Sequence, residues 1–209
     1  IMYRRTRTQK EPETLNIYPA FTDLMSNAFM ILSLFLLLAL LQSQELNRKL
    51  QSATPITIDE KSGNFKFKSG SAELNPQLKN YVRVKVIPDI EKIIKEKGDA
   101  IDFIQVIGHT DGQANNKIST LDQKIELAAN GKNTIESLSP GSNADLGLMR
   151  ALAVIQEIQK TKQFKNVKFR AYSAGQLYLS SGELAPINRN ADETRRRIEI
   201  RFIPRGETQ

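Results

Sequence analysis

An acidic residue, Asp23, lies near the start of the most apolar part of this sequence. The run over residues 21–41 is long enough to cross a bilayer, because a membrane-spanning helix needs about 20 apolar residues at ~1.5 Å each. A carboxylate at the centre of such a helix costs about 2.5–3.5 kcal/mol and commonly marks the path of an ion. Two interpretations stay open: Asp23 caps the beginning of the helix, or it exchanges a proton where a protein partner covers it.

The first half of the apolar run has a polar side. Thr22, Ser26 and Ser33 fall on one stripe of a helix, and Asn27 lies one turn after Asp23. Lipid does not favour a polar face, so we expect a protein partner to cover this stripe.

The composition excludes several kinds of chemistry. The chain has no cysteine, and His109, interpreted as a structural residue of a turn, is its only histidine, so no ordinary zinc or copper ligand set can form. Lys and Arg outnumber Asp and Glu by 30 to 23, but they are spread among acids, and nucleic-acid binding is not expected. No paired carboxylates suited to catalysis are evident, so we expect no enzymatic activity, no metal and no cofactor.

The N-terminal part divides into a tail, a membrane helix and a stalk. Residues 1–17 are polar without an apolar period and predict a cytoplasmic tail, and residues 18–41 predict an uncleaved transmembrane helix. Residues 42–55 form a stalk that prolongs the helix until Pro55 stops it. More Lys and Arg precede the span than closely follow it, so we expect the N-terminus in the cytoplasm and the C-terminal part outside.

The remaining sequence predicts an α+β domain over residues 56–204, followed by a short tail at 205–209. Alternation in ITIDEKSGNFKF predicts a β-hairpin, and IDFIQVIG, VKFRAYS and RRIEIRFI predict three further strands. Helical spacing predicts amphipathic helices in YVRVKVIPDIEKIIKEKG, which Pro88 begins or kinks, and in LGLMRALAVIQEIQK. We expect the helices to lie on one face of a mixed sheet.

A polar segment at residues 112–142 interrupts this pattern. It is rich in Gln, Asn, Ser, Thr and Lys, with one weak amphipathic run at Ile118, Leu121, Ile125 and Leu127. Loops of this length inside a compact domain are unusual and are commonly functional or mobile. The sequence predicts an insertion but leaves its role open.

Three motifs of the domain resemble a known family when they are taken together. FKFKSGSAELNP, IQVIGHTD and NADLGLMRA occur in the order typical of OmpA-like peptidoglycan-binding domains, and TRRRIEIRF resembles the family's last strand. The resemblance covers about residues 56–204, apart from 112–142. It departs from the family pattern at Lys68, Gly147 and Arg195, where other residue types are common.

This resemblance implies a site for the stem peptides of peptidoglycan. These peptides commonly carry diaminopimelate, whose ammonium and carboxylate on one carbon match an aspartate and an arginine fork. Asp111 and Arg150 are the matching positions, with Asn143 and Leu146 on the helical face of Arg150 and Arg196 in the last motif. Each has an ordinary alternative, since Asp111 could cap a turn and Arg150 could be a solvated helix charge.

The membrane helix carries a second resemblance. YPAFTDLMSNAF is similar to the signature of the B subunits of ion-driven stators, such as flagellar MotB, in which an acid takes up and releases the ion. The resemblance implies that Asp23 carries a proton, or sodium in its place. The proton motive force supplies ~2.3 kcal/mol for each charge that moves across 100 mV, without any bond chemistry.

Among stator-type proteins, the FTDLM core, the short stalk and the long insertion look most like the B subunit of Zorya anti-phage defence systems. That resemblance implies an inner-membrane homodimer with its wall-binding domain in the periplasm, surrounded by a pentamer of a larger A subunit. Two alternatives stay open: a flagellar MotB-type stator subunit, and a passive OmpA-like anchor between membrane and cell wall.

Overall fold

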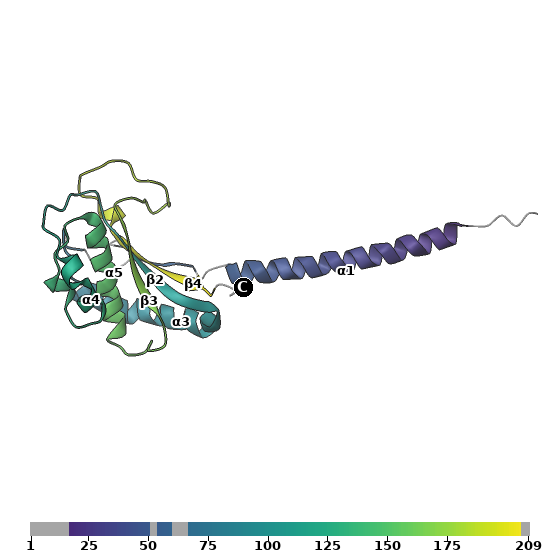
Figure 1. Ribbon diagram of the computed structural model, residues 1–209, viewed down its shortest axis with the longest axis horizontal. Coiled ribbons are helices and arrows are strands. Elements are labelled where there is room, and N and C mark those ends of the chain that lie inside the picture. The colour runs from purple at the N-terminus through teal and green to yellow at the C-terminus, as the bar shows by residue number, and fades with distance from the viewer. Residues whose placement is uncertain (1–16, 51–53, 60–66, 206–209) are drawn as a thin grey trace, which may run out of the picture. The chain divides into compact units, whose positions relative to one another are not determined.

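The computed structural model describes residues 17–50, 54–59 and 67–205, and of residues 46–50 only the backbone (Figure 1). The chain divides into two units, Ile1–Arg48 and Lys49–Gln209, and each has its own architecture. Almost all of the predicted tail, part of the stalk and most of the second strand of the predicted hairpin lie outside the described residues.

The first unit contains a single described helix. α1 (Tyr18–Leu50) includes a 28-residue segment, Tyr18–Glu45, with a mean hydropathy of 2.4. By length and composition this segment can cross a membrane. The helix continues past residue 41 as predicted, so the stalk begins as a helical extension of the apolar segment.

The second unit is built on a four-stranded mixed sheet with the order β1-β4-β2-β3. β4 (Arg197–Pro204) lies antiparallel to both β1 (Ile56–Asp59) and β2 (Ile101–His109), and β3 (Phe169–Gly175) runs parallel to β2. The predicted α+β class with a mixed sheet is confirmed. The described partner of β1 is β4, whereas most of the predicted hairpin partner lies outside the described residues.

The predicted first helix of the domain is a longer rod with a widened turn. The rod consists of α2 (Pro76–Tyr81), the π-helical turn η1 (Val82–Val86), α3 (Ile87–Lys97) and the 3-10 turn η2 (Gly98–Ala100). Pro88 has no N–H to donate, and its ring crowds the preceding turn. The π-helical turn just before it accommodates this ring, so Pro88 perturbs the helix without ending it.

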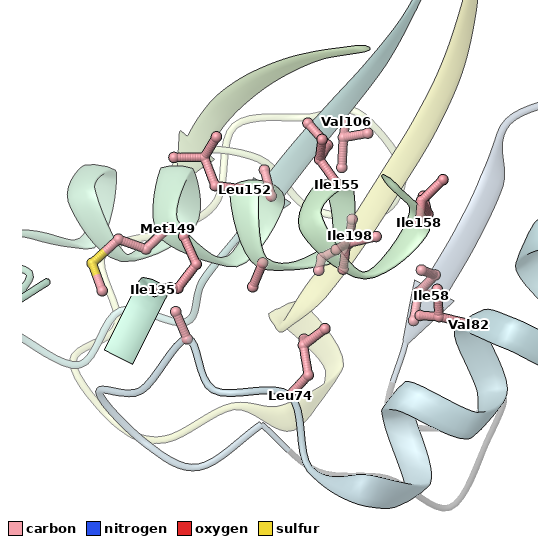
Figure 2. Packing of buried hydrophobic residues seen from close by; sticks show 14 of the residues in the cluster. Ile58, Leu74, Val82, Val106, Ile135, Met149, Leu152, Ile155, Ile158 and Ile198 are labelled. Carbon is pink, nitrogen blue, oxygen red and sulfur yellow. The ribbon is translucent and has the colours of Figure 1, made fainter. Parts of the chain in front are cut away.

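α5 (Asn143–Gln159) lies along β2 and β3 and completes the core. Gly108 of β2 and Gly147 of α5 approach so closely that a Cβ on either residue would overlap the backbone of the other, and one on Gly147 would also overlap Ser173. Glycine at position 147, a departure from the family pattern, is therefore needed for this contact. The core of the domain includes Val106 of β2, Ile198 of β4, and Met149, Leu152, Ile155 and Ile158 of α5 (Figure 2).

The insertion is folded and is not an open loop. It contains α4 (Leu121–Ala129) and the 3-10 turn η3 (Ile135–Ser137), and α4 contacts α5. Of the predicted amphipathic run, Leu121 is buried and Ile125 half-buried, whereas Ile118 and Leu127 are exposed. The expectation of a long loop is therefore wrong for α4 and η3.

Candidate functional site

Predicted binding residues lie near the end of β2 and the start of β4, the two central strands of the sheet. Asp111 follows the end of β2, Arg196 precedes the first residue of β4, and Asn143 begins α5. In the antiparallel register His109 lies opposite Arg197, so the end of β2 and the start of β4 are neighbours.

Asp111 is buried, and both of its carboxylate oxygens accept hydrogen bonds. Oδ1 accepts from the N–H of Gln113 at 3.3 Å, and Oδ2 accepts from the N–H of Asp192 at 3.3 Å and pairs with Nη1 of Arg196 at 3.5 Å. The bond to Gln113 is the turn-capping role that was the alternative for this residue. The bonds to Asp192 and Arg196 also tie the turn after β2 to the segment before β4, and they satisfy a buried charge.

Arg150 is among the largest fully buried side chains, with 1% of its surface exposed. Its Nε donates to the carbonyl oxygen of Ser71 at 3.1 Å, and its Cζ lies 4.7 Å from the centroid of the Phe67 ring. A desolvated guanidinium over an aromatic face is attracted by the ring quadrupole. Arg150 is therefore not a solvated helix charge, and that alternative is wrong.

Gln113, which no sequence motif singled out, connects the parts of this site. Its N–H donates to Asp111, its carbonyl accepts from Nδ2 of Asn143 at 2.8 Å, and its Oε1 accepts from Oγ of Ser69 at 3.0 Å. Ser69 lies two residues before Ser71, the partner of Arg150. The only available signal for Gln113 was its place two residues after Asp111 in the sequence.

Asn143 and Leu146 lie on the buried side of α5 together with Arg150, as their spacing predicted. Oδ1 of Asn143 accepts from Nδ2 of Asn115 at 3.4 Å, which adds a second contact between α5 and the insertion. Hydrogen bonds and an ion pair connect Asp111, Asn143 and Arg196 through the turn after β2, and Arg150 is connected to them by way of Ser71 and Ser69 in the loop before α2. Leu146 is buried on α5.

The segment between β3 and β4 covers a further side of the assembly. A Cβ on Gly112 would overlap the carbonyl oxygen of Asn188, so glycine allows this segment to pass directly over the turn. Arg195 is buried, and its Nη2 donates to the carbonyl oxygen of Gln176. Arginine at position 195, another departure from the family pattern, thus fastens the covering segment.

His109 belongs to a different cluster, on the opposite face of the sheet. Its Nε2 lies 3.2 Å from Oε1 of Glu199, an ion-pair distance without hydrogen-bond alignment, and Glu199 also binds Arg197 at 2.9 Å and Arg201 at 2.6 Å. The His109 ring, and to a lesser extent the bonds from the two arginines, hold the pKa of the Glu199 carboxyl well below its usual range. Burial opposes this shift in pKa. No group of three side chains able to hold a metal ion occurs among the described residues.

Asp23 lies inside α1. The helix begins at Tyr18, and no acidic residue is in its first turn. An N-cap residue must precede the first helical residue, so the capping interpretation of Asp23 is wrong.

The predicted polar stripe of α1 divides into two kinds of residue. The hydroxyls of Thr22 and Ser33 donate to backbone carbonyl oxygens of the preceding turn, at 2.8 and 2.9 Å, and are satisfied within the helix. Ser26 and Asn27 make no side-chain hydrogen bond within the described part of the chain. Their side chains are therefore the part of the stripe that the helix does not satisfy by itself.

Comparison with known proteins gives likenesses only among solved structures. No protein-family model matches the chain, and no curated protein matches it. The similar solved structures include periplasmic domains of MotB and OmpA-like domains.

A putative MotB-like protein from Desulfovibrio vulgaris is 16% identical over 72% of this chain and 75% of its own, with a TM-score of 0.44. The periplasmic domain of Helicobacter pylori MotB is 18% identical over 73% of this chain and 83% of its own, also with a TM-score of 0.44. The OmpA-like domain of FopA1 from Francisella tularensis is 19% identical over 72% of this chain and 73% of its own, with a TM-score of 0.37. Likeness at this level establishes no family for the chain.

Proposed function

We propose that this chain is the wall-anchored B subunit of a proton-driven, stator-type motor in the bacterial inner membrane, acting in anti-phage defence of the Zorya kind. The observation that carries the proposal is the position of Asp23 within the apolar segment of α1, in a chain that also holds the buried Asp111 and Arg150 assembly.

The wall-binding half of the proposal rests on the contacts of Asp111 and Arg150. Asp111 is bonded to the N–H of Gln113, and Arg150 is bonded to the carbonyl oxygen of Ser71. These are a donor and an acceptor of the kinds that the ammonium and carboxylate of diaminopimelate would supply. A stem peptide would bind by replacing these two loop contacts, while the sheet and α5 keep the charged groups in place.

The motor half rests on the acid in the membrane helix. A carboxyl covered by a protein partner favours its neutral form, so Asp23 would bind a proton on one side of the membrane and release it on the other. The partner is a pentamer of a membrane A subunit around a dimer of this chain, with Ser26 and Asn27 facing it. Sodium is the alternative ion. In this arrangement the N-terminus is cytoplasmic and the second unit is periplasmic.

A passive anchor between membrane and wall is the second candidate. The bonds of Thr22 and Ser33 within α1 favour it, because these hydroxyls need no partner in lipid. In a passive anchor the carboxyl of Asp23 has no transport role.

The test is plaque formation by a phage panel on cells that carry this gene with its neighbouring genes. Asp23→Asn is compared with wild type and with Asp23→Glu, which keeps an ionisable carboxyl, at matched membrane levels. We expect Asp23→Asn to abolish protection and Asp23→Glu to retain part of it. Equal protection by wild type and Asp23→Asn would establish the passive anchor. If wild type itself gives no protection and loss of the gene impairs swimming, the chain is a flagellar MotB-type subunit.

A further inference from the structure

The folded insertion forms one wall of a groove beside Arg150. The groove has a volume of ≈ 270 Å³ and lies between residues 68–73 and residues 135–140. Met149 of α5 also lines it, and Figure 2 shows this side chain next to Ile135 of the insertion. Met149 belongs to the same helix as Arg150, so the groove and the candidate site share α5.

The insertion wall is fastened by hydrogen bonds. The N–H of Thr120 donates to the carbonyl oxygen of Ser139 at 3.0 Å, and the N–H of Ser139 donates to Oγ1 of Thr120 at 2.9 Å. From α5, Nε2 of Gln156 donates to the carbonyl oxygens of Ala128 and Asn133, at 2.7 and 3.2 Å. These bonds hold the wall in a defined position relative to α5.

The opposite wall is held by the candidate site itself. Ser71 accepts from Arg150 and Ser69 donates to Gln113, and both serines also line the groove. A ligand that reaches Arg150 by replacing the Ser71 contact therefore arrives at the end of this groove.

Two larger grooves also have charged residues in their lining, and some of these residues form ion pairs with each other. In the groove of ≈ 730 Å³ on the open face of the sheet, Arg197 and Arg201 both bind Glu199. In the groove of ≈ 440 Å³ between α5 and the insertion, Lys160 binds Glu157 at 3.0 Å. The second of these grooves is also lined by Lys79, Lys132 and Glu136, and it shares Glu136 with the groove beside Arg150.

The groove beside Arg150 is the one whose lining includes Ser71, the hydrogen-bond partner of Arg150. Lys68, Lys117, Glu73 and Glu136 line it and are exposed, and none of the four forms an ion pair within the described part of the chain. Uncommitted charges of both signs suit a ligand that carries both signs. An aromatic side chain would offer a flat apolar face to a sugar ring, and the described lining includes none.

We infer that this groove binds a second stem peptide of the cell wall, through the ammonium and carboxylate that share one carbon of its diamino acid. Lys68 and Lys117 bind the carboxylate, and Glu73 and Glu136 bind the ammonium. The inference rests on the proposed wall-binding function and gives the insertion a role, because Lys117 and Glu136 both belong to it. One domain then holds two neighbouring stem peptides.

The experiment is equilibrium dialysis of the purified full chain in detergent against a labelled disaccharide-tetrapeptide that carries diaminopimelate. We expect wild type to saturate at two ligands per chain and Lys117→Glu or Glu136→Lys to saturate at one. Lys165→Glu, an exposed charge reversal outside the groove, is the matched control and should still saturate at two.

The outcomes separate this inference from the proposed function. Saturation of wild type at one ligand, lost in Arg150→Lys and unchanged in Lys117→Glu, overturns the second site and supports the first. Saturation at one ligand that is lost in Lys117→Glu and unchanged in Arg150→Lys supports the groove and overturns the Asp111 and Arg150 site. No binding by wild type overturns both.

Discussion

Two clusters of buried charge lie on opposite faces of one sheet, and they are satisfied in different ways. On the open face, Glu199 contacts His109, Arg197 and Arg201, so this carboxylate is satisfied by side chains of the same sheet, while Arg197 also donates to the loop carbonyl oxygens of Tyr178 and Leu179. On the helix-covered face, Asp111 and Arg150 bond largely to the backbone of loops. A ligand can replace a hydrogen bond from a loop more easily than one from a side chain of a neighbouring strand. The difference separates a cluster that stabilises the fold from one that we propose binds the wall.

The largest expected effect comes from Gly108→Ala, which breaks the close contact between β2 and α5. The added Cβ would overlap the carbonyl group of Gly147, which is backbone and cannot move aside as a side chain does. We expect a loss of about 3 kcal/mol or more in the free energy of unfolding, measured by urea titration. Gly98→Ala, whose Cβ would meet only the Ile94 side chain at 3.5 Å, is the control and should change stability by about 1 kcal/mol or less.

Arg150→Met tests the covered face alone. The variant keeps much of the side-chain volume but loses the hydrogen bond to Ser71 and the contact with the Phe67 ring. We expect a loss of about 2–3 kcal/mol in the free energy of unfolding. The pH dependence of stability should stay as in wild type, because Glu199 is unchanged. Stability equal to wild type in urea titration would show that the buried guanidinium contributes nothing to holding the loop before α2.

Glu199→Gln tests the open face alone and has a pH signature. We expect a loss of about 2 kcal/mol at pH 7, because Arg197 stays buried with a weaker partner. The folded pKa of Glu199 lies well below the ordinary value of 4.5, so the carboxylate contributes fully above pH 4.5 and loses its contribution as pH falls below that value. The stability difference between wild type and Glu199→Gln should therefore narrow in acid. Urea midpoints from pH 7 to pH 3 measure it, and a constant difference would contradict the account.

Glu157→Gln has a smaller expected effect than the three preceding variants. Burial raises the pKa of Glu157, but its bonds to Lys160 and Arg83 outweigh burial and lower it. Nη2 of Arg83 lies 2.6 Å from Oε1 and joins η1 to α5, yet both cations are largely exposed and return to water when the acid is lost. We expect a loss of about 1 kcal/mol in urea titration. Lys85→Ala, which breaks the exposed pair with Asp89, should lose still less, and the reverse order would contradict this interpretation.

The sequence predicted the parts of the fold that periodicity determines. β2, β4 and α5 carry regular apolar patterns, so their positions and the shared face of Asn143, Leu146 and Arg150 followed from spacing. The contacts of Gln113 and Ser71 did not follow, because they join loops through backbone groups that every residue type possesses. The folded insertion was missed for a related reason, since only half of its weak apolar run faces the core.

The most direct test of the central claim is retention of the full chain on isolated sacculi at pH 7, comparing wild type, Arg150→Lys and Glu199→Gln at equal folded fractions. Arg150→Lys keeps the charge but loses the fork that matches a carboxylate. We expect wild type and Glu199→Gln to remain on the sacculi and Arg150→Lys to be retained much less than either, since only the groove would still bind a stem peptide in that variant. Retention of Arg150→Lys at the wild-type level, or equal release of both variants, would contradict this account.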